Sequence, residues 1–174
     1  MNNKIIALIA LAVVLGLVNG SIVAKEKHLA EGQVVYLELA PVDPRSLMQG
    51  DYMALNFRVG QQVYDALPKS EHYRGWNRGV DASDGYVVVR LDDNRVASFQ
   101  RLDDDTPLAD NELKLHYRVR NGEVKFATNA FFFQEGHAQP YEAARYGEFR
   151  VNDQGHVLLA AMFDEQLQKI QPED

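Results

Sequence analysis

The chain changes its local pattern within residues 41–57, PVDPRSLMQGDYMALNF. Asp43 is a favourable N-cap residue and Pro44 suits the first helical position, so we expect one or two helical turns that end at Gln49. Gly50 can then adopt the left-handed conformation that terminates a helix without a Cβ penalty. The segment predicts a rigid turn, and no catalytic mechanism follows from it.

The residues after Asp51 alternate between apolar side chains and polar or small ones, which is typical of a β-strand. The apolar positions of this pattern are Met53, Leu55, Phe57 and Val59. We therefore predict a strand that continues to Val59. A short helix is expected from Gly60 to Leu67, ending before Pro68.

Two segments of the chain resemble a known family. The first, Gly50-Asp51-Tyr52-x-x-Leu55-x-Phe57, is similar to the signature of the GDYXXLXY family of uncharacterised bacterial membrane-anchored proteins, and residues 41–45 are similar to the segment that precedes this signature. The second, Phe132-Phe133-Gln134-Glu135-Gly136 followed by Glu142, resembles the family's aromatic-x-x-Glu-Gly segment and the glutamate beyond it. The resemblance spans most of the chain.

One position departs from the family signature, because Phe57 stands where the family has Tyr. This departure implies that the hydroxyl is dispensable there and that the ring serves packing. The resemblance implies a membrane anchor and an extracytoplasmic domain, without an established activity. Members of the family tend to be encoded beside polytopic membrane proteins, which implies that such proteins are partners.

The N-terminal region has the length and composition of a membrane-spanning helix. Ile5 to Ala24 contains twenty residues without a charge, which at about 1.5 Å each is enough to cross the hydrocarbon core of a bilayer. We predict an uncleaved signal anchor; the alternatives are a signal peptide cleaved after Gly20 or Ala24 and a buried helix of a soluble protein. The helix is expected to continue to Glu31 and to stop at Gly32.

Charges on both sides of the apolar run bear on its orientation. Lys4 and the amino terminus supply a positive flank for the cytoplasmic side, although Lys25 and Lys27 follow the run on the other side. We expect a single-pass inner-membrane protein that contacts lipid through this helix, with its C-terminal domain facing the periplasm. The predicted division is an anchor over residues 1–32 and a β domain over residues 33–174.

The β domain is predicted to be a run of antiparallel hairpins. Strands are expected at residues 33–40, 86–91, 95–102, 113–120, 123–127, 131–133, 148–151 and 156–163. Asn121-Gly122 between two alternating segments is the strongest of the hairpin signals. With a helical turn or two expected at residues 141–146, the predicted fold class is mainly β: an antiparallel, hairpin-rich domain with one or two short helices, preceded by an N-terminal transmembrane helix.

Composition excludes several classes of function. The net charge of −7 argues against nucleic acid as a partner, because binding to phosphates needs a basic face. The chain has no cysteine, which excludes disulfides, thiolate metal sites and cysteine nucleophiles. The spacing of His137 and Glu142 is not that of metal ligands, and neither Asp92-Asp93 nor residues 103–105 match a calcium loop. No metal or cofactor is therefore predicted, and the acidic loop at residues 103–105 is expected to be solvated.

Two polar groups could carry function. Asp43, Arg45 and Asp51 lie close together in the sequence and could line an exposed pocket, or they could simply cap and brace the turn. Glu135, Glu142 and Arg145 lie next to an aromatic triplet, where a desolvated carboxylate could act as an acid or base, or could serve a structural turn. The candidate binding residues are Asp43, Arg45, Gly50, Asp51, Tyr52, Leu55, Phe57, Glu135, Gly136, Glu142 and Arg145.

Three hypotheses for function follow. The first is a non-enzymatic, membrane-anchored binding module that works with other membrane proteins. The second is a hydrolase or small-ligand-binding enzyme that uses Glu135 or Asp51 as a general base. The third is a purely structural component of the envelope. Convergence of the candidate residues in one concave pocket would favour the second hypothesis.

Overall fold

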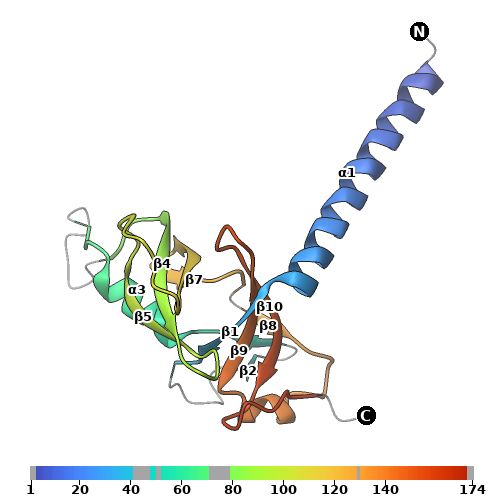
Figure 1. Cartoon of the computed structure of the whole chain (residues 1–174). Helices are drawn as coiled ribbons and strands as arrows, with labels where there is room; N and C mark the ends of the chain where they lie inside the picture. Colours follow the sequence, from blue (N-terminus) through green and yellow to red (C-terminus); the bar gives the residue numbers. More distant parts are fainter. Residues whose placement is uncertain (1–2, 41–47, 50–51, 71–78, 129, 172–174) are drawn as a thin grey trace.

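The computed structural model describes residues 3–40, 48–49, 52–70, 79–128 and 130–171. A single long helix, α1 (Asn3–Glu31), projects from a β-rich domain, and none of its residues is buried (Figure 1). By length and composition it is able to cross a membrane. The helix ends at Glu31, and β1 begins at Gln33 directly after Gly32, as the sequence predicts.

The described part of the β domain forms three antiparallel sheets. The first has the order β1-β9-β10, from Gln33–Glu38, Tyr146–Val151 and Val157–Phe163. The second has the order β2-β3-β8, from Met48–Gln49, Tyr52–Ala54 and Ala130–Phe132. The third has the order β5-β4-β6-β7, from Ala97–Leu102, Ser83–Leu91, Glu112–Arg120 and Glu123–Lys125. The described residues of the domain also form a helix, α3 (Arg58–Ala66), and a 3-10 helix, η1 (Gln139–Ala143).

The first and third sheets are joined at the start of β5. Tyr36 of β1 forms a parallel bridge with Val96, and its N–H donates to the Arg95 carbonyl at 3.0 Å. The apolar faces of both sheets meet in one core, whose fully buried members include Val35, Leu37, Val87, Val89, Leu115 and Phe149. The alternation that predicts β1 is confirmed, because Val35, Leu37 and Leu39 are all buried.

The hairpin turns have the chemistry that the sequence indicates. Asn121 and Gly122 both have positive φ, 54° and 75°, as a type I′ turn between β6 and β7 requires. In the β4–β5 turn the Asp92 carboxylate accepts the N–H groups of Asn94 and Val96 at 2.9 and 2.8 Å. The mainly antiparallel β fold predicted from the sequence is therefore confirmed.

Two predicted boundaries around the signature are wrong. The helical turn predicted from Asp43 lies outside the described residues except at its end, and that end is not Gln49, because Met48 and Gln49 form β2, which pairs with Met53 and Tyr52 of β3. The strand predicted to reach Val59 ends at Ala54, and α3 starts at Arg58.

The error has a physical cause at Phe57. This residue has extended dihedral angles (φ −111°, ψ 142°) at the N-cap of α3, so its side chain stays on the buried face that Met53 and Leu55 share. Val59 then lies on the buried face of the helix together with Val63, four residues on. Alternating burial thus continues across a change from strand to helix.

At the other end of the chain, the helical turn predicted for residues 141–146 is the shorter and earlier η1, because Tyr146 already belongs to β9.

Candidate functional site

The signature residues divide into buried and surface positions. Phe57 is 4% exposed, and its ring lies edge-on to Phe149 with 5.2 Å between centroids. Leu55 is also buried, whereas Tyr52 is partly exposed on β3. The burial of Leu55 and Phe57 gives them a packing role, and four candidates, Asp43, Arg45, Gly50 and Asp51, lie outside the described residues.

The two family-like segments meet in the second sheet. β3 pairs with β8 in the register Tyr52↔Phe132 and Met53↔Phe131. Phe132 is 73% exposed, and its ring centroid lies 5.8 Å from that of Tyr52. β8 is the last strand in the order of this sheet. An aromatic pair therefore lies at the surface where the signature strand meets the second segment.

Both candidate glutamates after β8 are exposed to solvent. Glu135 is exposed in a turn where Gly136 has φ +83°, and Glu142 is exposed on η1. The desolvation expected of a general base is not found at Glu135. The aromatic residues of this region pack on one another, since the ring of Tyr141 lies 5.1 Å from that of Phe131 and 5.2 Å from that of Phe133, between centroids.

Arg145 contributes through its main chain. Its N–H donates to the Phe163 carbonyl and its own carbonyl accepts the Leu39 N–H, both at 2.8 Å. The guanidinium is directed to the neighbouring Ala144 carbonyl at 2.9 Å. Arg145 therefore ties the end of β10 to the segment after β1, and this role is structural.

A groove next to the signature strand was not predicted. It has a volume of about 570 Å³ and runs between α3 and β7. Leu55 and Phe57 contribute to one wall, and Tyr64 and Val124 contribute to others. Gly60 also lines the groove, but a Cβ there would make an ordinary contact at 3.6 Å with the Val124 carbonyl oxygen, so this glycine gave no signal in the sequence.

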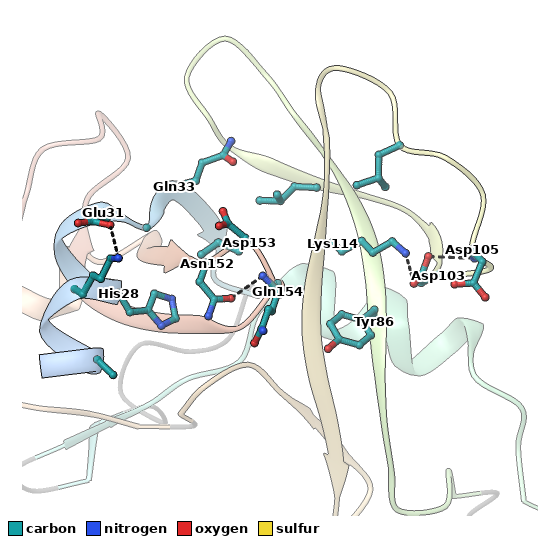
Figure 2. Close-up of a pocket in the computed structure, with 17 residues that line it drawn as sticks. His28, Glu31, Gln33, Tyr86, Asp103, Asp105, Lys114, Asn152, Asp153 and Gln154 are labelled. Carbon is teal, nitrogen blue, oxygen red and sulfur yellow. Dashed lines mark hydrogen bonds and ion pairs between the residues drawn. The ribbon is translucent and has the colours of Figure 1, made fainter. Parts of the chain in front are cut away.

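A larger cleft of about 790 Å³ lies at the base of α1 (Figure 2). Its walls come from the last turns of α1, from β4 and β6, and from the turn between β9 and β10. Polar side chains that line it include His28, Glu31, Asp103, Lys114 and Asn152. Sequence reasoning missed this cleft because its residues come from four distant segments without a shared motif.

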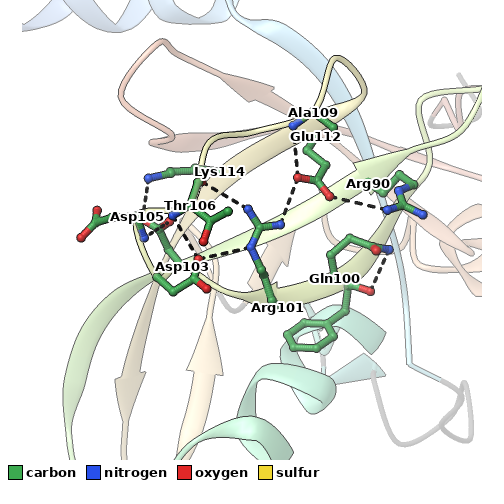
Figure 3. Close-up of polar contacts among 11 residues, drawn as sticks. Arg90, Gln100, Arg101, Asp103, Asp105, Thr106, Ala109, Glu112 and Lys114 are labelled. Carbon is green, nitrogen blue, oxygen red and sulfur yellow. Dashed lines mark hydrogen bonds and ion pairs between the residues drawn. The ribbon is translucent and has the colours of Figure 1, made fainter.

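The acidic loop beside the cleft is ordered by ion pairs. Lys114 Nζ lies 2.7 Å from the Asp103 carboxylate, and this hydrogen bond raises the pKa of Lys114. Arg101 donates to Asp104 at 3.3 Å and to Glu112 at 3.0 Å, as Figure 3 shows for the latter pair. The hydrogen bond from Arg101 is the main cause of a lowered pKa at Glu112. The loop predicted to be merely solvated therefore has two of its three aspartates in ion pairs.

The described residues contain no group of three or more histidine, aspartate or glutamate side chains able to hold a metal ion. Fold and surface together define a small antiparallel β domain carried on one helix of membrane-spanning length. The chain belongs to the GDYXXLXY family, whose model, described as GDYXXLXY protein, matches residues 14–162. Comparisons with curated proteins and with solved structures find no match.

Proposed function

We propose that the protein is a membrane-anchored, extracytoplasmic binding module that works with other membrane proteins and is not an enzyme. In this proposal α1 is an uncleaved signal anchor in the inner membrane. Its helix runs without a break from Asn3 through Glu31, past the end of the uncharged segment at Ala24. Lys4 would stay on the cytoplasmic side, and the β domain would face the periplasm.

The observation that carries the proposal is the exposed ring of Phe132. Phe132 is a large aromatic side chain with 73% of its surface exposed, next to the ring of Tyr52, and such an area is available for a partner to bury. Aromatic residues are enriched at the centres of protein interfaces because they bury a large apolar area with little conformational freedom to lose. The ring lies beside Tyr52, the first signature residue of the described part of the motif.

The position of Phe132 connects the family signature to a binding role. Leu55 and Phe57 are buried, so these two signature residues stabilise the core of the domain. Tyr52 is the signature residue that lies at the surface, together with Phe132. A partner that fits this surface would present apolar side chains from an extracytoplasmic loop of a membrane protein. The anchor keeps both proteins in the same membrane, which raises their effective concentration.

A site-specific photo-crosslinking experiment tests this proposal. Phe132 is replaced by a photoreactive phenylalanine analogue in the full-length protein in its native membranes, and adducts are identified by mass spectrometry. The matched control places the same analogue at Leu108, another exposed apolar side chain of the domain. The expected result is an integral membrane protein joined at position 132 and absent at position 108. Equal labelling at both positions, or adducts without a membrane protein, would reject the proposal.

A further inference from the structure

The turn between β9 and β10 rests directly on β6. The His116 N–H donates to the Gly155 carbonyl at 2.8 Å, which joins the first sheet to the third. Gly155 has φ +74°, and a Cβ at this position would lie 2.7 Å from the Lys114 carbonyl oxygen. The two main chains are therefore in close contact, and the turn has one defined docking position.

Two histidine rings meet at this junction. The rings of His116 and His156 are edge-on, with 5.3 Å between centroids and 87° between planes. The ring of Tyr86 packs on His116 in the same manner, at 5.2 Å and 62°. His116 is partly buried by these contacts. Edge-on packing of this kind suits neutral rings.

The charges around His116 do not favour a proton on its ring. The titratable and charged groups that the packed elements bring to the junction are Asp84 and Tyr86 of β4, Lys114 and Arg118 of β6, and Asp153 and His156 of the β9–β10 hairpin. Asp84 already pairs with Arg120 at 2.8 Å. Burial first, and then the neighbouring His156, lower the pKa of His116, while Asp84 opposes them.

We propose that His116, with the His156 ring packed on it, forms a proton-operated latch: the neutral His116 ring holds the turn at residues 152–155 on β6, and protonation of His116 releases it. A positive charge is unfavourable on the partly buried His116 ring, and the released turn would let this ring reach water. The released form binds more protons than the docked form. Docking is therefore strongest above about pH 6.5, the ordinary histidine pKa, and weakens progressively as the pH falls below that value.

Release of the latch would act on two neighbouring features. Residues 151–155 form part of the wall of the cleft at the base of α1, so the shape of the cleft depends on whether the turn is docked. β9 also contacts the helix, because His28 Nε2 lies 2.9 Å from the Arg150 carbonyl oxygen. The latch thus connects the acidity outside the membrane to the junction between the domain and its helix.

The experiment uses the absence of cysteine from the chain. Gln154→Cys in the full-length, detergent-solubilised protein carries a single fluorophore on the exposed turn, and its anisotropy is followed from pH 7.5 to 5. We expect the anisotropy to fall with pH. Between pH 7 and 5 the equilibrium constant for release should rise by at most on the order of 20-fold, the value for one histidine that is neutral only in the docked form.

Variants separate the latch from a general effect of acid. In the chain labelled at position 154, the double variant His116→Gln/His156→Gln is expected to keep a high, pH-independent anisotropy. The variant His137→Gln, on an unrelated turn, should behave like the labelled chain with no histidine replaced. A pH response that survives in the double variant would overturn the proposal. The proposal would also be overturned if the labelled chain with no histidine replaced showed no change of anisotropy with pH, or if the double variant were undocked at pH 7.5. A fluorophore at Gln168→Cys that responds at the same pH would show unfolding of the domain and would equally reject the latch.

Discussion

The third sheet and the second sheet, which contains the signature strand β3 and is called the signature sheet below, expose different kinds of side chain. In the third sheet and its adjoining loop, charged groups are paired with one another, as in Arg101–Glu112, Lys114–Asp103 and Arg120–Asp84. In the signature sheet, an aromatic ring at Phe132 faces water on the last strand of the sheet. The comparison indicates that the charged side chains of the third sheet find their partners within the domain. The signature sheet instead presents an apolar surface that burial would stabilise.

The largest expected effect comes from the buried side of the signature. Phe57→Ala should lower the free energy of unfolding by about 3–5 kcal/mol, because it removes a ring that fills the core beside Phe149. Denaturant unfolding of the full-length protein measures this loss. Phe132→Ala is the matched control, and its cost should stay within about 0.5 kcal/mol because the ring is exposed. Equal losses in the two variants would contradict the division of the signature region into core and surface.

A second prediction compares two glycines in tight turns. Gly122→Ala should cost about 1–2 kcal/mol, since its φ of +75° is unfavourable for alanine although the space around it is open. Gly155→Ala should cost about 1–3 kcal/mol more, because its Cβ would also collide with the Lys114 main chain. The two free energies of unfolding are compared under the same conditions. A Gly155→Ala variant no less stable than Gly122→Ala would show that the turn is not docked on β6.

The ion pairs of the third sheet make a prediction about acid. Because Arg101 lowers the pKa of folded Glu112, its contribution is complete above the ordinary glutamate pKa of about 4.3 and is lost as the pH falls through the lower folded value. Glu112→Gln should therefore lower stability at pH 7 and weaken its decline between about pH 5 and 3. Denaturation midpoints across this range test the expectation. Glu123→Gln, at an exposed pair with Lys125, should leave the profile unchanged.

The smallest effect is expected at the anchor. Deletion of residues 2–24 should change the stability of the β domain by no more than about 0.5 kcal/mol, because none of the α1 residues is buried. The measurement is the denaturant midpoint of the shortened chain, with β-sheet circular dichroism as a check on folding. An insoluble product without a β-sheet spectrum would show that the domain does not begin at residue 33.

Local signals account for what could be predicted from the sequence. Asn121-Gly122 specifies a turn with both residues at positive φ, so the β6–β7 hairpin was predictable from two residues and their flanks. The uncharged run from Ile5 to Ala24 likewise predicts a long helix without reference to the rest of the chain.

The errors arise where tertiary contacts decide the structure. The end of β3 could not be located because alternating burial continues from Leu55 through Phe57 into α3. β2 depends on its pairing with β3, which no local pattern of Met48 and Gln49 indicates. The cleft at the base of α1 and the exposure of Phe132 depend on how distant segments are arranged, so residue types alone could not predict them.

The direct passage from α1 into β1 determines how the domain can move. Seven helical residues separate Ala24 from Gly32, and at about 1.5 Å each they hold the domain roughly 10 Å above the end of the uncharged segment. The contact of His28 with the Arg150 carbonyl oxygen joins residues 25–31 to β9. The domain therefore does not rotate as freely about the helix as it would on a flexible linker. The direction in which the domain faces therefore follows the rotation of the helix about its axis: one residue inserted after Ala24 would turn Phe132 by about 100° around that axis.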